Sequence, residues 1–497
     1  MSKKSITKNY IYNMIYQALT MILPLVTTPY LSRVLGSEPI GIYSYTYSIV
    51  SYFLLFGSLG VNLYGQREIA YVNNDKKKRK KVFWEITTCR FVTMFIAIII
   101  YFFFLARTGE YAVYYRIWLL ELVAMAFDIC WFFQGLEDFK KTVIRNIIVR
   151  IASVTLIFVL VKTPEDLIKY ITIYSIADLV GNISLWFYLP KYFKGIKIGK
   201  IRTFYHLHPI IVLFIPQIAS QVYNILDKTM IGNIIADKSE VGFYEQSQKV
   251  IRVLLTLVTS LGIVMVPRMA STFASGDKKK TIEYMKKSFK FVYFLAFPVV
   301  FGLISVSTSF VPIFFGEGYD KVSTLLNVIS PTIILTGIAS VIGTQYLLPV
   351  KRHKEYTYTI VIGLIFNFIL NYILINLYTS IGASIATVIS ELIVVIAQFY
   401  VIRKDIKIKQ VIKLSYPYFF ASLIMFAVTM IEKIIFGART KSNSNSNSNR
   451  RTSIYCYTMD FKRWIFKNVC WKRKKYVKNK CIKNEKMSHR DGPFASY

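Results

Sequence analysis

The chain has 497 residues, of which 54% are hydrophobic and 16% aromatic, and its mean hydropathy is positive. This composition excludes an ordinary soluble domain and is typical of a membrane protein with several spans. The net charge of +35 would suit a nucleic-acid-binding protein. The Lys and Arg residues nevertheless fall in the gaps between apolar runs, so we expect no nucleic-acid partner.

Thirteen apolar runs of the length that spans a bilayer as a helix follow one another along the chain. The first, from about residue 10, lacks the small-residue cleavage pattern of a signal peptide. The sequence therefore predicts an all-α polytopic membrane protein. The spans are expected at roughly 10–32, 39–64, 82–106, 112–135, 143–162, 167–190, 209–233, 241–267, 289–314, 322–349, 356–376, 381–402 and 414–437.

Basic residues are far more frequent in one set of alternate gaps, the set that includes the N-terminus. Examples are "NNDKKKRKK" at 73–81, "GDKKK" at 276–280 and "KRHK" at 351–354. Cytoplasmic loops hold the excess of Lys and Arg, so we expect a multi-pass protein of the cytoplasmic membrane with its N-terminus inside. The opposite loops are short; "NLYTS" at 376–380 is nearly a bare turn. They leave no room for a catalytic domain, which argues against an enzyme.

The segment 438–497 differs from everything before it. It starts with "TKSNSNSNSNRR" at 440–451 and is strongly basic. Thirteen spans would place it outside, against the charge bias. If the repeat is encoded by AGT and AAT, a reading frame shifted by one base gives Val-Ile repeats and a fourteenth apolar span. We therefore predict that the tail is out of frame and forms no packed structure; the alternative is a flexible Ser/Asn linker with a basic disordered end.

The Cys and His residues of the sequence do not show the spacing of a metal or cofactor site. The five Cys contain no CxxC, and the four His show no ligand spacing. We therefore expect no metal and no cofactor.

A short motif recurs in the two halves. Gly41-Ile42-Tyr43 opens the second span, and Gly242-Phe243-Tyr244 opens the eighth, each after a short acidic loop. The repeat predicts two pseudo-symmetric six-helix bundles around a central cavity, which is how many transporters achieve alternating access. The bundles are expected at 1–207 and 208–402, followed by a thirteenth span in 403–437 and the tail at 438–497.

Four stretches carry a family resemblance: 7–53, 224–250 ("NILDKTMIGNIIADKSEVGFYEQSQKV"), 264–271 ("VMVPRMAS") and 314–326 ("FFGEGYDKVSTLL"). The first 437 residues resemble polysaccharide-repeat-unit (oligosaccharide) flippases of the Wzx type, in the multidrug/oligosaccharidyl-lipid/polysaccharide exporter superfamily. The resemblance implies transfer of undecaprenyl-diphosphate-linked oligosaccharide to the outer leaflet, coupled to an ion gradient. The glycan would enter capsule, exopolysaccharide or O-antigen, with a polysaccharide polymerase and chain-length machinery as partners.

Polar and cationic residues inside spans are costly and are candidates for function. Those on one face of the seventh span and on the eighth span are expected to line the cavity, with Arg33 of the first. Their cations would bind the diphosphate. The alternative is structural: ion pairs Asp227–Lys228 and Glu245–Lys249, or snorkelling of Arg33. The candidates are Arg33, Gln217, Gln221, Asn224, Lys228, Glu245, Lys249 and Arg252.

Four acids are candidates for binding a coupling proton or cation: Asp128, Asp178, Asp227 and Glu391. Asp128, Asp178 and Glu391 can equally fix the bundle by pairing with Arg90 or Arg150, which the sequence leaves open.

Two other functions compete with the flippase. A multidrug exporter of the same superfamily should have a more acidic and aromatic pocket. A lipid II flippase is a nearer relative, which the sequence distinguishes less clearly from an oligosaccharide flippase. A polysaccharide polymerase or glycosyltransferase is disfavoured because such enzymes generally carry a large outer loop or a clustered acidic motif.

Overall fold

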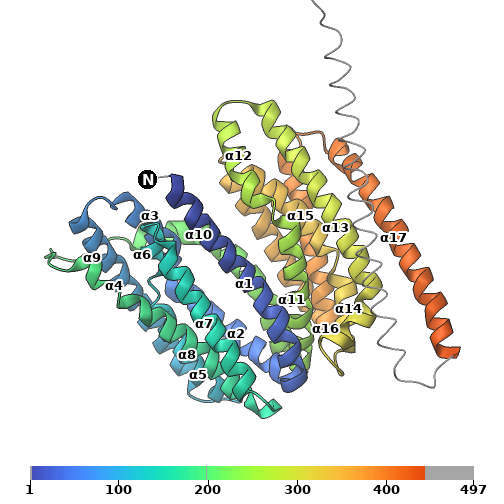
Figure 1. Ribbon diagram of the computed structural model, residues 1–497, viewed down its shortest axis with the longest axis horizontal. Helices are drawn as coiled ribbons and strands as arrows, with labels where there is room; N and C mark the ends of the chain where they lie inside the picture. The colour runs from blue at the N-terminus through green and yellow to red at the C-terminus, as the bar shows by residue number, and fades with distance from the viewer. Residues whose placement is uncertain (1–2, 198, 443–497) are drawn as a thin grey trace, which may run out of the picture. The chain divides into compact units, whose positions relative to one another are not determined.

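A computed structural model describes residues 3–197 and 199–442 (Figure 1). All regular structure in these ranges is helical, which confirms the predicted all-α class. The prediction for the tail falls on 443–497, outside the described residues.

The first half of the chain contains nine α-helices, a π-helical turn (η1) and a 3₁₀ turn (η2), shown from blue to green in Figure 1. The bounds are α1 Lys3–Leu35, α2 Ser37–Ser58, α3 Val61–Tyr71, α4 Lys76–Tyr101, η1 Phe102–Ala106, α5 Ala112–Ala126, α6 Cys130–Gly135, α7 Phe139–Leu160, η2 Pro164–Asp166, α8 Leu167–Trp186 and α9 Pro190–Phe193.

The described part of the second half contains eight α-helices and a second π-helical turn (η3). The bounds are α10 Leu207–Ile234, α11 Ser239–Thr259, α12 Gly262–Ala274, α13 Lys278–Phe314, α14 Asp320–Ile329, α15 Thr332–Ile342, η3 Gly343–Leu347, α16 His353–Ile402 and α17 Ile408–Ser442.

Every predicted span falls mostly on helix. Eight of the described helices are long and apolar enough to cross a membrane, or nine if the α11–α12 pair, bent by 41°, is one span. The long α16 is interrupted at Thr379, whose φ of 54° is not helical, so it contains the predicted turn between the eleventh and twelfth spans. The chain is thus a polytopic membrane protein, and the number thirteen stays a prediction.

Local sequence explains where several helices begin. Asp75 precedes α4, and its carboxylate accepts hydrogen bonds from the backbone N–H groups of Lys77 and Lys78 at 2.9 and 3.0 Å. Asp277 does the same for Lys280 at the start of α13. Such caps satisfy the N–H groups that a helix leaves unpaired at its first turn. Gly36, with φ of 82°, separates α1 from α2 in a conformation that glycine adopts without strain.

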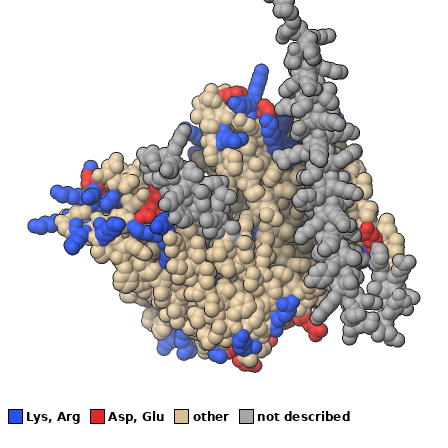
Figure 2. Space-filling model, in the orientation of Figure 1, with Lys and Arg blue, Asp and Glu red and all other residues tan. Residues whose placement is uncertain are grey.

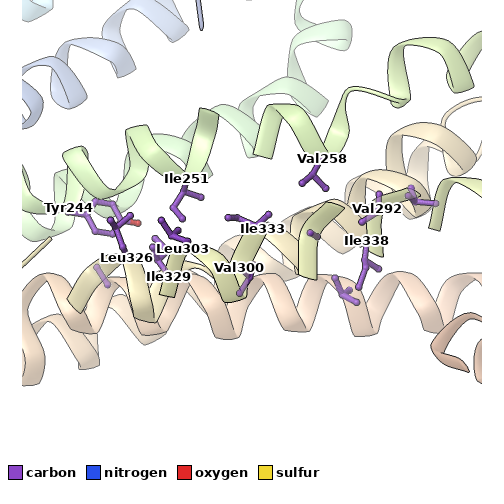
Figure 3. Close-up of a cluster of buried hydrophobic side chains, with 14 of the residues drawn as sticks. Tyr244, Ile251, Val258, Val292, Val300, Leu303, Leu326, Ile329, Ile333 and Ile338 are labelled. Carbon is purple, nitrogen blue, oxygen red and sulfur yellow. The ribbon is translucent and has the colours of Figure 1, made fainter. Parts of the chain in front are cut away.

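Three buried apolar clusters support the helices. Two belong to the first half; one is built around Phe83 and Trp131 and the other around Tyr101 and Trp118. The largest belongs mainly to the second half, where residues of α11, α13, α14 and α15 interlock (Figure 3). It also includes Leu31, Leu35 and Ile40 from the first half. On the face shown in Figure 2, Lys and Arg lie mostly toward the two ends, with a largely uncharged band between them.

The two halves meet through several helix pairs. α2 packs against α10 and α11, α1 touches α11, and α3 touches α10. Residues Met1–Phe426 form one compact unit, and the division of this unit at residue 207 remains a prediction.

Candidate functional site

The polar face predicted for α10 is partly open. Gln221 and Asn224 are exposed, and Lys228, one turn further on, is partly buried. The side chain of Gln217 lies outside the described residues. Exposed amides in the middle of a long apolar helix favour a hydrated surface, because amides facing hydrocarbon would leave hydrogen-bonding groups unsatisfied.

A group of cations surrounds one buried carboxylate, Glu245 of α11. Lys228 Nζ lies 3.1 Å from its Oε2, and an Arg252 guanidinium nitrogen lies 3.9 Å from the same atom. Lys249 is close enough to act electrostatically on Glu245. The Arg252 side chain is 54% exposed, whereas that of Glu245 is 9% exposed. We call Lys228, Glu245, Lys249 and Arg252 the cation cluster; its formal net charge is positive.

The ion pairs expected from the sequence are replaced by others. Glu245 pairs with Lys228 of the neighbouring helix, not with Lys249 on its own. Asp227 does not pair with Lys228, because adjacent residues on a helix point in different directions. The sequence identified the charged residues but not the helix–helix packing that decides their partners.

Asp227 of α10 instead lies in a buried network of neutral groups from two other helices, α11 and α16. Its carboxylate accepts hydrogen bonds from Asn371 Nδ2 at 2.6 Å, from Thr387 Oγ1 at 2.9 Å and from the Tyr244 hydroxyl. Asn371 Nδ2 also donates to Asn367 Oδ1 at 3.1 Å. Asn371 Oδ1 has no partner in the described structure. We call these five residues the Asp227 network.

The other candidate acids have local partners. Asp128 lies 3.6 Å from the buried guanidinium of Arg90, and Asp178 lies 3.7 Å from Arg150. These are the arrangements that the sequence left open as structural alternatives. Glu391 accepts a hydrogen bond from Thr336 Oγ1 at 3.1 Å, so the expected arginine is not its partner.

Arg33 lies at the end of α1, apart from the residues that pair with Glu245. Its guanidinium donates to the carbonyl of Ile313 at 2.5 Å and packs against Gly316. It therefore joins α1 to the C-terminal end of α13. The structure gives Arg33 a role in contact between the halves, and its role in binding remains a prediction.

Close to Arg33, the beginnings of α2 and α11 touch. Ser37 Oγ and Ser239 Oγ are 3.3 Å apart, and Lys238 Nζ donates to the carbonyl of Gly232 at 2.7 Å. Lys238 thus satisfies carbonyls at the end of α10, where a cation is also favoured by the helix dipole. Burial of this ammonium group lowers its pKa.

Several residues escaped the sequence analysis. Asn367, Asn371 and Thr387 of the Asp227 network are uncharged and come from a segment more than a hundred residues away. A group of tyrosines in α2 and α8 was also missed. Their spacing, Tyr43 and Tyr47 on one helix and Tyr170, Tyr174 and Asp178 on the other, places each set on one helical face and was the available signal.

The arrangement suits binding of an anion and of a small cation at separate places. The cation cluster offers Lys and Arg donors with fewer carboxylates than cations, and the Asp227 network offers a carboxylate among amide and hydroxyl oxygens. Among the described residues no group of three or more His, Cys, Asp and Glu is placed to hold a metal ion.

The chain is 27% identical to a putative O-antigen transporter of Escherichia coli over 81% of its own length and 98% of the relative's. It is 23% identical to the capsular polysaccharide biosynthesis protein CapF of Staphylococcus aureus over 80% and 99% of the two chains.

Among solved structures, the lipid II flippase MurJ shares the fold with a TM-score of 0.66 and 18% identity, covering 86% of this chain and 96% of that one. Residues 212–373 also match the MatE family. Residues 6–273, more than half of the chain, match the family described as polysaccharide biosynthesis protein. The chain therefore belongs to the polysaccharide biosynthesis protein family.

Proposed function

We propose that the chain is a flippase that moves undecaprenyl-diphosphate-linked oligosaccharides across the cytoplasmic membrane. The observation that carries the proposal is the cation cluster, in which Lys228, Lys249 and Arg252 share the single carboxylate of Glu245. Uncompensated charge at membrane depth is costly, and a diphosphate would neutralise it. The family and the names of its relatives, an O-antigen transporter and a capsular polysaccharide biosynthesis protein, support the same cargo.

The transport cycle follows from the two halves. We propose that the exposed amides of α10 and the cation cluster line the transport path, and that the halves rock to open it to each side in turn. The N-terminus would face the cytoplasm, and the glycan would pass to a polymerase outside. The Asp227 network is proposed as the site of the coupling ion, a proton or small cation, because it combines a carboxylate with a free amide oxygen.

A lipid II flippase is the second candidate, favoured by the fold shared with MurJ. Both cargoes contain an undecaprenyl diphosphate, so the cation cluster alone does not separate them. A multidrug exporter, suggested by the MatE match, is less consistent with a cluster of net positive charge.

The test uses cells that depend on this protein for surface polysaccharide. Lys228→Ala and Arg252→Ala should each reduce surface polymer at least several-fold, while lipid-linked repeat units accumulate on the cytoplasmic side. Lys287→Ala is the matched control, since its partner Glu283 is solvent-exposed and such pairs contribute little. Normal amounts of surface polymer in both Lys228→Ala and Arg252→Ala, at normal protein levels, would overturn the proposed role of the cation cluster. If the wild-type protein does not rescue cells that lack their lipid II flippase, the second candidate function is excluded.

A further inference from the structure

A second candidate binding surface lies in the N-terminal half, where aromatic rings of α2, α5 and α8 form a continuous group. Tyr43 and Tyr47 stack at 6.0 Å with nearly parallel rings, and Tyr43 lies 4.9 Å from Tyr170. Tyr47 contacts Trp118 at 4.9 Å and Tyr174 at 6.3 Å. Trp118 is completely buried, whereas the four tyrosines are only partly buried. The indole thus supports the tyrosine rings from inside the bundle.

Carboxylates accompany these rings, and one of them is incompletely satisfied. Glu121 of α5 is 9% exposed, and its Oε2 has no hydrogen-bond partner in the described structure. Asp178 pairs with Arg150, whose guanidinium lies 5.3 Å from the centre of the Tyr174 ring. Both acids lie within electrostatic reach of the Tyr47 hydroxyl. A buried acceptor without a donor is costly, so it indicates a place where a ligand donor is missing.

The combination matches the chemistry of a sugar ring. A pyranose presents one face of polarised C–H groups, which fit the negative face of an aromatic ring, and a rim of hydroxyl donors. Carboxyl oxygens accept hydrogen bonds from such hydroxyls. Arg150, beside the rings, pairs with Asp178 and is therefore less available to an acidic sugar. A neutral sugar is the better match.

The position of the rings relative to the cation cluster is also suitable. Glu245 of the cluster lies within electrostatic reach of the Tyr170 hydroxyl, although the two residues belong to different halves. A diphosphate held by Lys228 and Arg252 would therefore have its first sugars directed toward the tyrosines.

We propose that Tyr43, Tyr47, Tyr170, Tyr174 and Glu121 form a binding surface for a neutral sugar ring of the lipid-linked oligosaccharide. The proposal rests on the proposed function and adds a glycan-recognition role for the N-terminal half.

The test compares two ligands on the purified full-length protein in detergent: undecaprenyl diphosphate alone, and the same lipid carrying one neutral N-acetylhexosamine. Tyr47→Leu, which removes the ring and keeps apolar bulk, should weaken binding of the glycosylated lipid roughly tenfold. Binding of the unglycosylated lipid should not change. Tyr47→Phe should keep most of the affinity, and Glu121→Gln should lower affinity for the glycosylated lipid only.

Tyr400→Leu is the control, because Tyr400 is 63% exposed and contacts Arg403 on the surface. Equal affinity of Tyr47→Leu and wild type for the glycosylated lipid would overturn the proposal, and so would an equal loss for both lipids. If Tyr47→Leu does not fold, judged by its thermal midpoint, Glu121→Gln decides by the same criterion. A wild-type protein that binds neither lipid would instead refute the flippase function itself.

Discussion

Glu245 is the residue on which the charge balance of the site depends. It is the one carboxylate within 4 Å of both Lys228 and Arg252 among the described residues, and it is almost fully buried. Removing one partner of a buried ion pair leaves the other charges uncompensated, which typically costs about 3–5 kcal/mol. The same removal should strengthen attraction for an external anion, because the positive potential is no longer partly cancelled.

We therefore expect Glu245→Gln to lower the thermal midpoint of the purified protein. Added inorganic pyrophosphate should raise the thermal midpoint of Glu245→Gln by more than it raises that of the wild type. The measurement is a thermal unfolding series at increasing pyrophosphate and constant ionic strength. Glu283→Gln serves as the control, since Glu283 is 60% exposed and pairs with Lys287 alone. An identical pyrophosphate shift in Glu245→Gln and wild type would contradict anion binding at the cluster.

Charge and helical spacing in the sequence predicted the charged residues of the site, but not their partners. Lys228, Glu245 and Arg252 stood out because charged residues are rare inside apolar runs. Their pairing depends on how α10 and α11 are rotated against each other, which no local pattern encodes. Asn371 and Thr387 were not identified, because a neutral side chain inside a span is ordinary until its neighbours are known.

At the scale of helices, the recurring Gly-aromatic motif has a structural reason that the sequence did not disclose. Gly41 of α2 and Gly242 of α11 lie against each other where the two halves meet. A Cβ at Gly41 would lie 1.7 Å from the carbonyl oxygen of Lys238, and one at Gly242 would lie 2.2 Å from that of Ser37. The two contacts are equivalent, each glycine meeting the carbonyl four residues before the other. The sequence pattern did not disclose that the two copies of the repeat touch, and the similarity of the two halves stays a prediction.

This contact predicts that Gly41→Ala and Gly242→Ala push α2 and α11 apart. Both obstacles are backbone atoms, which cannot rotate away, so each substitution should destabilise the closed contact by about 1–3 kcal/mol or more. The variants should show a lower thermal midpoint and faster thiol labelling of a cysteine introduced at Ser37. Gly199→Ala is the control, because nothing lies within 4 Å of its added Cβ. Unchanged labelling in both variants would mean that the helices do not meet there.

At the scale of the whole molecule, the halves are joined at the ends where α2 and α11 begin. Ser32 of α1 accepts from Gln246 Nε2 at 2.9 Å, and its carbonyl accepts from the Tyr319 hydroxyl at 3.2 Å. Arg33 and the Ser37–Ser239 contact belong to the same end. If the N-terminus faces the cytoplasm, as proposed, this end is the outer face, and the described conformation is closed there. Release of cargo outside would require these contacts to separate.

A disulfide at this place tests whether they do. Ser37→Cys combined with Ser239→Cys replaces two oxygens that are 3.3 Å apart, a separation from which small side-chain adjustments can form an S–S bond. The oxidised double variant should lose transport in proteoliposomes, because the outer face can no longer open, and a reductant should restore it. The two single variants control for oxidation of natural cysteines. Full transport by the cross-linked protein would exclude alternating access through this face, since the halves would then have moved cargo without separating where α2 meets α11.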